Sequence, residues 1–262
     1  MYLDLHLKQQ FFRILSCHCE ILLRMKVDFV LSCGCACRPA YHTKKYFLRK
    51  FSSPCDWMMN YSLVHFIDVL KNEGKNMFRI PRLDEENKWV VDEENGMISM
   101  HDFKTNVPLD IQLPDFYAKM ERRAKNTINK IKQSRCVGIV MNRQIGKSEL
   151  LEFTHSLEML FPECVFYIIN IKDIPDYENS ETTYVIKTDK YIVKEICFDD
   201  SHHDGRDKSK NSSFWIGNEA LWGRVLVDNF YVKGCRYKYY KHRIIQKIRG
   251  LYNRILKLFD SE

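Results

Sequence analysis

Apolar and polar positions along the chain predict strands and helices that follow one another in turn. Short apolar runs bounded by turn residues predict buried strands, and longer runs with apolar residues three or four apart predict helices. Strands are expected at 27–31, 136–141, 164–171, 183–188 and 190–198. Helices are expected at about 36–48, 62–72, 114–133, 148–160, 214–231 and 236–259. The β-α-β alternation in the middle of the chain favours an α/β fold, with a mostly parallel sheet covered by helices on both faces.

A β-hairpin is expected before the long central helix. The β-rich runs 88–92 and 97–101 flank a segment that contains Asn-Gly, which is a strong turn signal. His101 should therefore lie at the end of a strand. The helix that follows is expected to begin at Pro114-Asp115, because proline suits the first helical turn and an acidic residue there complements the helix dipole.

Composition is that of an ordinary globular protein. The chain has 262 residues, of which 45% are hydrophobic and 29% charged, enough for one large domain with its own core. No apolar run approaches the ~20 residues that a membrane-spanning helix needs, and the first residues lack the apolar region of a signal peptide. Ten cysteines, several clustered as Cys-x-Cys, indicate reduced thiols rather than disulfides. These features favour a cytoplasmic protein, with peripheral membrane attachment as an option.

Charge is unevenly distributed along the chain. The formal net charge is +7, with an acidic cluster at 84–94 and a strongly basic final thirty residues. A nucleic-acid role would need a basic face with interleaved aromatics, and only the C-terminal segment offers one, so no specific nucleic-acid partner is expected. The apolar stripe of that segment consists of Tyr240, Ile244, Ile248, Leu251, Ile255, Leu256 and Phe259. The predicted amphipathic helix could pack on the domain or lie on an anionic membrane surface.

Cys37 is the first candidate for chemistry. It follows an apolar strand and the Ser32-Cys33-Gly34 turn, where the next helix should begin. Free N–H groups and the helix dipole at that position favour the thiolate, which is the reactive form of the side chain. A small buried structural cysteine is the alternative interpretation.

Four pieces of the chain, in the right order, resemble the papain-like cysteine peptidase family DUF1796. The first is the Ser-x-Gly-x-x-Cys turn that ends at Cys37, and the second is the Ser-x-Pro-x-Asp-Trp segment that ends at Trp57. The third is an apolar strand that ends in His101-Asp102, and the fourth is the tryptophan-containing segment 214–222. The sequence departs from the family pattern in carrying extra thiols at Cys33, Cys35 and Cys55.

The resemblance also sets the expected domain organisation. It begins near Met25, which leaves 1–24 as an N-terminal extension, 25–232 as the α/β domain and 233–262 as a basic amphipathic C-terminal helix. A papain-like α+β fold is the alternative that the family label implies.

A cysteine nucleophile needs a base, and the base needs a residue to orient it. His101 is the candidate base, and Asp56 ranks before Asn170 and Asp102 as the orienting residue. The resemblance implies a cysteine-dependent hydrolase or acyl transferase that forms a thioester at Cys37 and acts on a peptide, amide or acyl substrate. A non-catalytic binding or scaffold module of the same fold is the alternative.

Three residues are candidates for substrate binding, and no cofactor is expected. They are Arg143 at a strand end, Trp57 beside the orienting aspartate, and Asn170 at the end of the next strand.

Gly146-Lys147-Ser148 follows a strand and opens a helix, as in a phosphate-binding loop. Such a loop needs its first glycine at position 141, which is methionine. A βα turn is therefore favoured, and a nucleotide-binding enzyme is kept as an alternative.

No metal site is expected. Cys17 and Cys19, with the cysteines near Cys37, are spaced by one residue, whereas a zinc knuckle spaces its cysteines by two to four. His202-His203-Asp204 lies in a polar segment and suggests a solvated loop.

Overall fold

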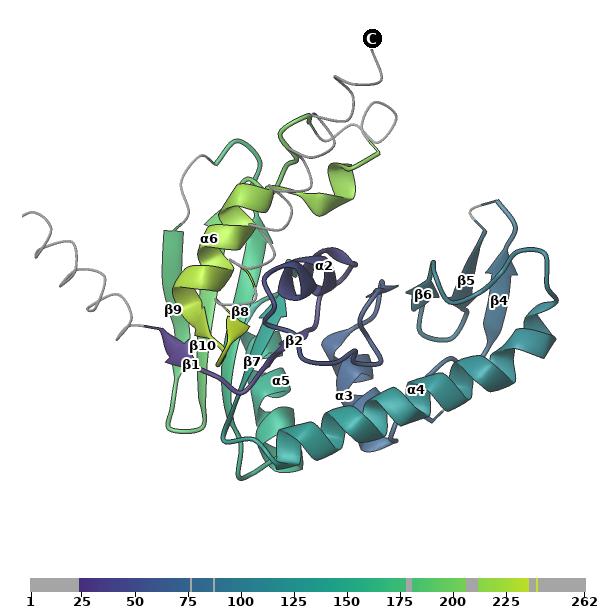
Figure 1. The fold of residues 1–262 in the computed structure, drawn as a ribbon, viewed down its shortest axis with the longest axis horizontal. Helices are drawn as coiled ribbons and strands as arrows, with labels where there is room; N and C mark the ends of the chain where they lie inside the picture. Colours follow the sequence, from purple (N-terminus) through teal and green to yellow (C-terminus); the bar gives the residue numbers. More distant parts are fainter. Residues whose placement is uncertain are drawn as a thin grey trace, which may run out of the picture.

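The main sheet has five strands. The computed structural model describes residues 24–75, 77–86, 88–177, 181–205, 212–235 and 239, and Figure 1 shows their arrangement. The strands are β2 (Val30–Ser32), β7 (Cys136–Met141), β8 (Val165–Asp173), β10 (Tyr191–Phe198) and β9 (Glu181–Lys187), in that spatial order. The first four are parallel, whereas β9 pairs antiparallel with β10.

Helices cover both faces of this sheet, as the alternation predicted. They are α2 (Arg38–Lys45), α3 (Leu63–Lys71), α4 (Leu109–Lys132), α5 (Lys147–Leu160) and α6 (Glu219–Asn229). On one face, Ile139 and Ile168 pack in the same cluster as Phe153 of α5. On the other face, Val140 and Ile169 pack with residues of α6. Because β7 is buried on both faces, its sequence CVGIVM is almost continuously apolar.

A second sheet of four strands is antiparallel. It contains β3 (Met58–Met59), β6 (Ile98–Ser99), β5 (Trp89–Asp92) and β4 (Pro81–Asp84). The Asn-Gly turn lies where the sequence placed it, with Gly96 at φ 73°. Figure 1 shows this sheet beside the N-terminal part of α4, away from the five-stranded sheet.

The prediction of a mostly parallel sheet needs correction. The edge strand β9 and the whole four-stranded sheet are antiparallel. A third, two-stranded sheet pairs β1 (Met25–Lys26) with β11 (Phe230–Tyr231) in parallel. The fold is therefore mixed α/β with several sheets. The turn signal predicted the antiparallel pairing of the two hairpin strands. It did not predict that two further strands, β3 and β4, would pair with them to form a separate sheet.

Two predicted helices differ from the observed ones. The central helix begins at Leu109, after Pro108 at its N-cap, so that Pro114 lies inside it. Pro114 is thus past the first turn, where its missing N–H leaves the Asp110 carbonyl without its helical hydrogen bond and its ring crowds that carbonyl. The predicted helix 214–231 is broken into the short η1 (Phe214–Ile216) and α6. Gly217 separates them at φ 71°.

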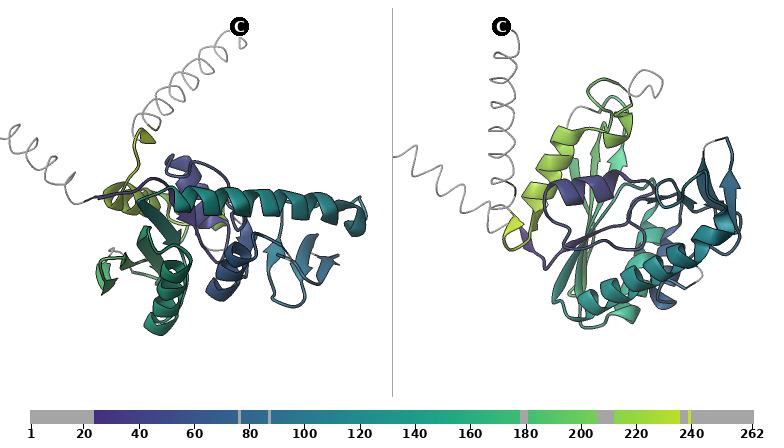
Figure 2. Two further views of the ribbon diagram at one scale, coloured as in Figure 1. Left: turned by 90° about the horizontal axis from the view of Figure 1, so that it is seen from below. Right: turned by 45° about the vertical axis from the view of Figure 1, so that its right-hand side comes forward.

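The parallel strands place their following loops at one edge of the sheet. The loop after β2 carries the cysteine cluster, the loop after β7 carries Arg143, and the loop after β10 carries Asp200. Figure 2 shows from two further sides how α2 and α6 lie on one face of the sheet. In an open α/β sheet, the carboxyl edge is where sites usually form.

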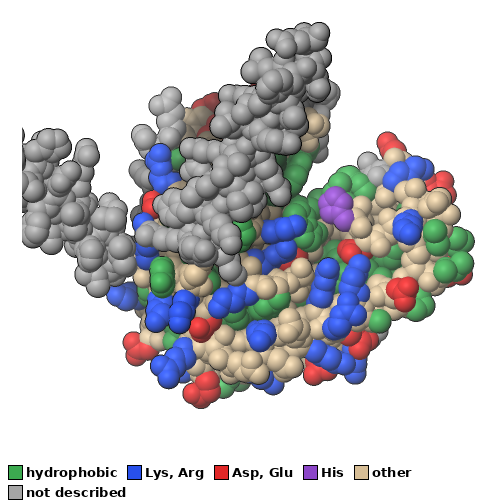
Figure 3. All heavy atoms as spheres, in the orientation of Figure 1, with side chains coloured by type: hydrophobic (Ala, Val, Ile, Leu, Met, Phe, Trp, Pro, Cys, Tyr) green, Lys and Arg blue, Asp and Glu red, His purple; other side chains and the backbone are tan. Residues whose placement is uncertain are grey.

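Two further findings concern charge and membranes. Lys and Arg side chains are spread across the face that includes α4, with Asp and Glu among them (Figure 3). Within the described residues, no helix combines the length and the apolar character needed to cross a bilayer. The predicted segments 1–24 and 236–259 lie almost wholly outside the described residues.

Candidate active site around Cys37

Cys37 stands at the N-cap of α2, directly before Arg38. Its backbone has φ −67° and ψ −16°, and Pro39 occupies the first turn. The side chain is 8% exposed. Its Sγ donates a hydrogen bond to the carbonyl oxygen of Trp57 at 3.6 Å. The strand-turn-helix arrangement that the sequence predicted for this cysteine is therefore present.

Burial outweighs the helix terminus in setting the acidity of this thiol. Loss of solvent around the sulfur raises the pKa of Cys37 to about 11, and its own backbone N–H acts in the opposite direction without cancelling that effect. In the conformation described, Cys37 is therefore a thiol at neutral pH. We expected a lowered pKa from the helix position alone, and the desolvation of the sulfur was not visible in the sequence.

The neighbouring thiols differ in how far they reach solvent. Cys33 and Cys55 are buried, whereas Cys35 is exposed. Burial raises the pKa of Cys33 to about 11. Cys35 Sγ donates to the carbonyl oxygen of Asn142 at 3.0 Å. An electrophile from solvent would therefore meet Cys35 first, since Cys33, Cys37 and Cys55 are all buried.

Arg143 holds the cysteine loop in place. It is 6% exposed, and its guanidinium donates to the carbonyl oxygens of Cys33, Gly34 and Tyr61 at 2.9, 3.0 and 2.7 Å. The guanidinium also lies over the Tyr61 ring, 4.7 Å from its centroid. This geometry supports a positioning role for Arg143, and substrate binding by this residue stays a prediction.

Asn170 in turn holds Arg143. The Asn170 side chain is fully buried. Its Oδ1 accepts from the Arg143 N–H at 3.0 Å, and its Nδ2 donates to the Arg143 carbonyl at 3.0 Å. Both hydrogen-bonding ends of the amide therefore contact backbone, and neither contacts His101.

Asp56 is the centre of a buried polar network. Its carboxylate accepts from Ser32 Oγ at 2.5 Å and from Ser53 Oγ at 3.0 Å and N at 3.1 Å. It also forms an ion pair with Arg49. These bonds attach the 53–57 turn to the end of β2. They give Asp56 of this segment a structural role, since the turn carries the Trp57 carbonyl to the Cys37 thiol.

Trp57 lies between the candidate nucleophile and the candidate base. Its backbone is in the left-handed region at φ 67°, which is rare for a bulky residue and is held here by the surrounding turn. The indole meets the exposed His101 ring edge-on, with centroids 6.2 Å apart. Within the described residues, no hydrogen bond joins Cys37 to His101.

Asp102 points its carboxylate at other partners. It accepts from Ser99 Oγ at 2.8 Å and pairs with Lys119 Nζ at 2.5 Å. The Lys119 contact fixes the chain after β6 to α4, whereas the Ser99 contact is local to the end of β6. Among the described residues, neither carboxylate hydrogen-bonds to His101, and the order proposed for the orienting residues stays a prediction.

The segment that resembles a phosphate-binding loop has the geometry of a βα turn. Met141 is the last residue of β7 and is fully buried. The backbone N–H of Arg143, two residues later, is taken by Asn170. A phosphate-binding loop directs such N–H groups at the anion instead.

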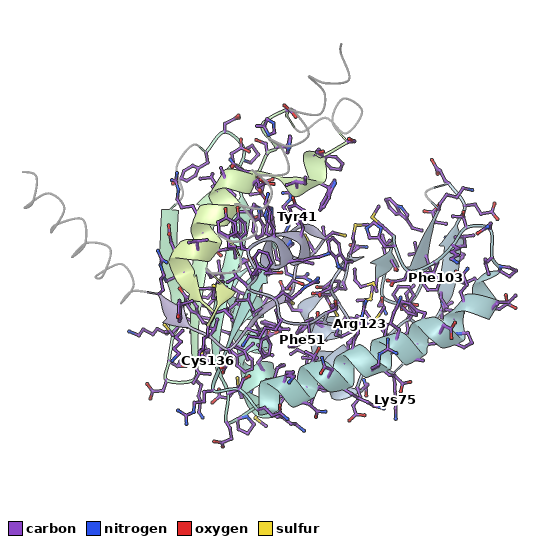
Figure 4. The ribbon with its side chains drawn as sticks, in the orientation of Figure 1. Tyr41, Phe51, Lys75, Phe103, Arg123 and Cys136 are labelled. Atoms are coloured by element: carbon purple, nitrogen blue, oxygen red, sulfur yellow. The ribbon has the colours of Figure 1, made fainter. Side chains whose placement is uncertain are left out.

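Sequence reasoning missed a buried cluster behind Cys37. Arg38 pairs with Asp200, and Asp200 Oδ1 also accepts from Trp222 Nε1 at 2.8 Å and from Asn218 N at 2.9 Å. Arg38 further donates to the carbonyl oxygen of Trp215 at 2.8 Å. The cluster fixes the start of α2 to α6, on the side where Figure 4 labels Tyr41. The one sequence signal for this cluster was Arg38, a charged residue directly after the candidate nucleophile.

The comparisons with known proteins bear on the region just described. Residues 28–163 match the family described as "Putative papain-like cysteine peptidase (DUF1796)", which is more than half of the chain. The chain belongs to this family. No curated protein and no solved structure matches it.

Membership in DUF1796 fits both the site and the fold. The matched region contains the Cys37 turn, the Trp57 segment and His101, whereas segment 214–222 lies beyond it. The mixed α/β architecture is consistent with the family description. The family therefore covers the proposed catalytic pair and leaves α6 outside.

Proposed function

We propose that the protein is a cysteine-dependent hydrolase or acyl transferase that acts through a thioester at Cys37. The observation that carries this proposal is the place of Cys37 at the start of α2, at the carboxyl edge of the sheet and inside the family-matched region. Two buried residues, Arg143 and Asp56, are committed to holding the loops around it. A catalytic nucleophile must be held rigidly in one geometry by surrounding residues, and Arg143 and Asp56 fix the loops around Cys37 in this way.

The reaction would proceed in two steps. The Cys37 sulfur attacks the carbonyl carbon of the substrate while its proton passes to the His101 imidazole. The imidazolium then returns that proton to the leaving amine or alcohol, and a thioester remains. Water completes a hydrolysis at this thioester, whereas an acceptor amine or alcohol completes a transfer. Backbone N–H groups at the start of α2 would stabilise the oxyanion.

This mechanism requires a rearrangement at Trp57. A base must come within about 3 Å of the thiol to take its proton, although such contacts are often longer in the absence of substrate. Here the Trp57 carbonyl accepts from the thiol and the Trp57 ring contacts His101. On binding, the substrate would have to displace the Trp57 carbonyl from the Cys37 thiol, so that the His101 ring could approach the sulfur.

The second candidate function is a non-catalytic binding module of the same fold. The raised pKa of Cys37 favours it, since a thiol with a pKa of about 11 is a weak nucleophile at neutral pH. No described contact favours the nucleotide-binding alternative.

Affinity labelling with peptide, amide and ester electrophiles separates these candidates. The modified cysteine is mapped in the wild type, Cys35→Ser and His101→Ala. The enzyme proposal expects Cys37 to be modified in the wild type and in Cys35→Ser, and at least tenfold more slowly in a folded His101→Ala. Equal rates with and without His101 would rule out the pair, and no modification of Cys37 by any reagent would favour the module.

A further inference from the structure

Two histidines and an aspartate converge just after β10. His202 Nδ1 lies 3.5 Å from Asp204 Oδ2, and His203 Nε2 lies 3.3 Å from Asp204 Oδ1. The ligand atoms of His202, His203 and Asp204 all lie within 4.8 Å of one another. The two imidazole rings are 4.0 Å apart between centroids, tilted by 38°.

The separations of 3.5 and 3.3 Å are close to those around a tetrahedral metal ion, and because they involve different oxygens of Asp204, the side chains would shift slightly when they bind one ion. Imidazole nitrogen and carboxylate oxygen bind zinc at about 2.0–2.2 Å, and ligands at the corners of such a tetrahedron lie about 3.3–3.6 Å apart. Imidazole suits zinc, copper and nickel, whereas magnesium and calcium prefer an all-oxygen set.

One side of the cluster is fixed and the other is open. His202 is 8% exposed, and its carbonyl accepts from Gly205 N at 2.8 Å, which closes the turn. Gly205 has φ 95°, a conformation that favours glycine. His203 and Asp204 are exposed, so an ion from solvent could reach them. The sequence suggested a solvated loop, and the burial of His202 could not be seen in it.

We propose that His202, His203 and Asp204 bind a divalent transition-metal ion of the zinc class. The ion takes the lone pair of His202 Nδ1, which otherwise accepts from the Asp204 backbone N–H at 3.1 Å. The Asp204 carboxylate neutralises part of the ionic charge. Three protein ligands leave one position of the tetrahedron open for water or another small ligand. The site is independent of the proposed chemistry at Cys37.

Cobalt(II) is the probe of choice, because its absorption spectrum separates nitrogen and oxygen ligands from thiolates. Protein without a histidine tag is titrated with Co²⁺ under reducing conditions, and Zn²⁺ is then added in competition. We expect one bound Co²⁺ with visible tetrahedral bands, no thiolate-to-metal charge-transfer band, and displacement by Zn²⁺.

Variants locate the ion. His203→Ala and Asp204→Asn replace exposed side chains and should each weaken Co²⁺ binding at least tenfold. His155→Ala, an exposed histidine on α5, is the matched control and should bind as the wild type does, as should Cys37→Ser. The proposal is overturned if Co²⁺ does not bind, if the first two variants bind like the wild type, or if a charge-transfer band shows that cysteines hold the ion.

Discussion

The thiol of Cys37 donates a hydrogen bond to the carbonyl oxygen of Trp57, 3.6 Å away. The same tryptophan contacts His101 through its ring. One residue therefore lies between the proposed nucleophile and the proposed base, so the proposed mechanism makes this a resting conformation. Activation would require the turn that carries Trp57 to shift.

The pH dependence of Cys37 alkylation should report this resting state. Because burial raises the pKa of Cys37 to about 11, its thiolate fraction should rise about tenfold per pH unit between pH 7 and 9. The iodoacetamide rate at Cys37, followed by peptide mapping, should rise in parallel without levelling off. In denaturant the rate should level off above the ordinary cysteine pKa of about 8.5. A plateau already at pH 6–7 in the folded protein would show a lowered pKa instead.

Asp56→Ala should destabilise the protein strongly. The change leaves Arg49 without its ion-pair partner, and the Arg49 side chain is only 10% exposed. Breaking a buried pair from one side costs about 3–5 kcal/mol. Urea unfolding should show a loss of that order, whereas Asp189→Ala, at an exposed aspartate, should change stability little. Wild-type stability combined with slower Cys37 chemistry would instead support Asp56 as the residue that orients the base.

His42 should make the fold sensitive to acid. Burial lowers the pKa of His42 to about 4, and the fully buried ring stacks on Trp222 with centroids 4.7 Å apart. The unfolded chain binds a proton near pH 6.5 and the folded one only near pH 4, so stability is present above 6.5 and is lost as pH falls toward 4.

Urea unfolding at pH 7 and pH 5 measures this contribution. The wild type should lose about 2 kcal/mol more than His42→Gln between the two pH values. His155→Gln, at the exposed histidine of α5, should lose as much as the wild type. An identical loss in His42→Gln and the wild type would mean that His42 is not responsible.

The basic C-terminal segment, residues 236–259, is the candidate membrane-binding part of the chain. We propose that its basic face and apolar stripe bind anionic membranes, so full-length protein should bind phosphatidylserine vesicles more weakly as salt rises. Protein lacking residues 236–262 should stay folded and lose that binding. An insoluble or molten truncated protein would show instead that the stripe packs on the domain.

Periodicity and turn signals predicted the main elements because they act locally. The apolar run of β7 was predicted with its observed ends, and the Asn-Gly turn was located correctly. Gly217 was not recognised as a helix break. The need for glycine at this position comes from the tertiary structure, because a Cβ at residue 217 would lie 2.3 Å from Asp200 Oδ1.

The candidate site was predictable in position and less so in chemistry. The placement of Cys37 before α2 follows from its local sequence. The roles of Arg143 and Asp56 depend on partners far along the chain or buried beneath the turn, such as the Cys33 carbonyl. The pKa of Cys37 depends on burial, which no spacing of residues reveals.

The most direct test of the central claim is to detect an acyl group on Cys37. Purified protein is mixed with a panel of activated peptide and acyl esters, quenched in acid, and analysed by intact mass and peptide mapping. The proposal predicts an added acyl mass on Cys37 that hydroxylamine removes, that is absent in Cys37→Ser and that persists in Cys35→Ser. Acylation of Cys35 alone, or no acylation of Cys37 by any ester in folded protein, would contradict it.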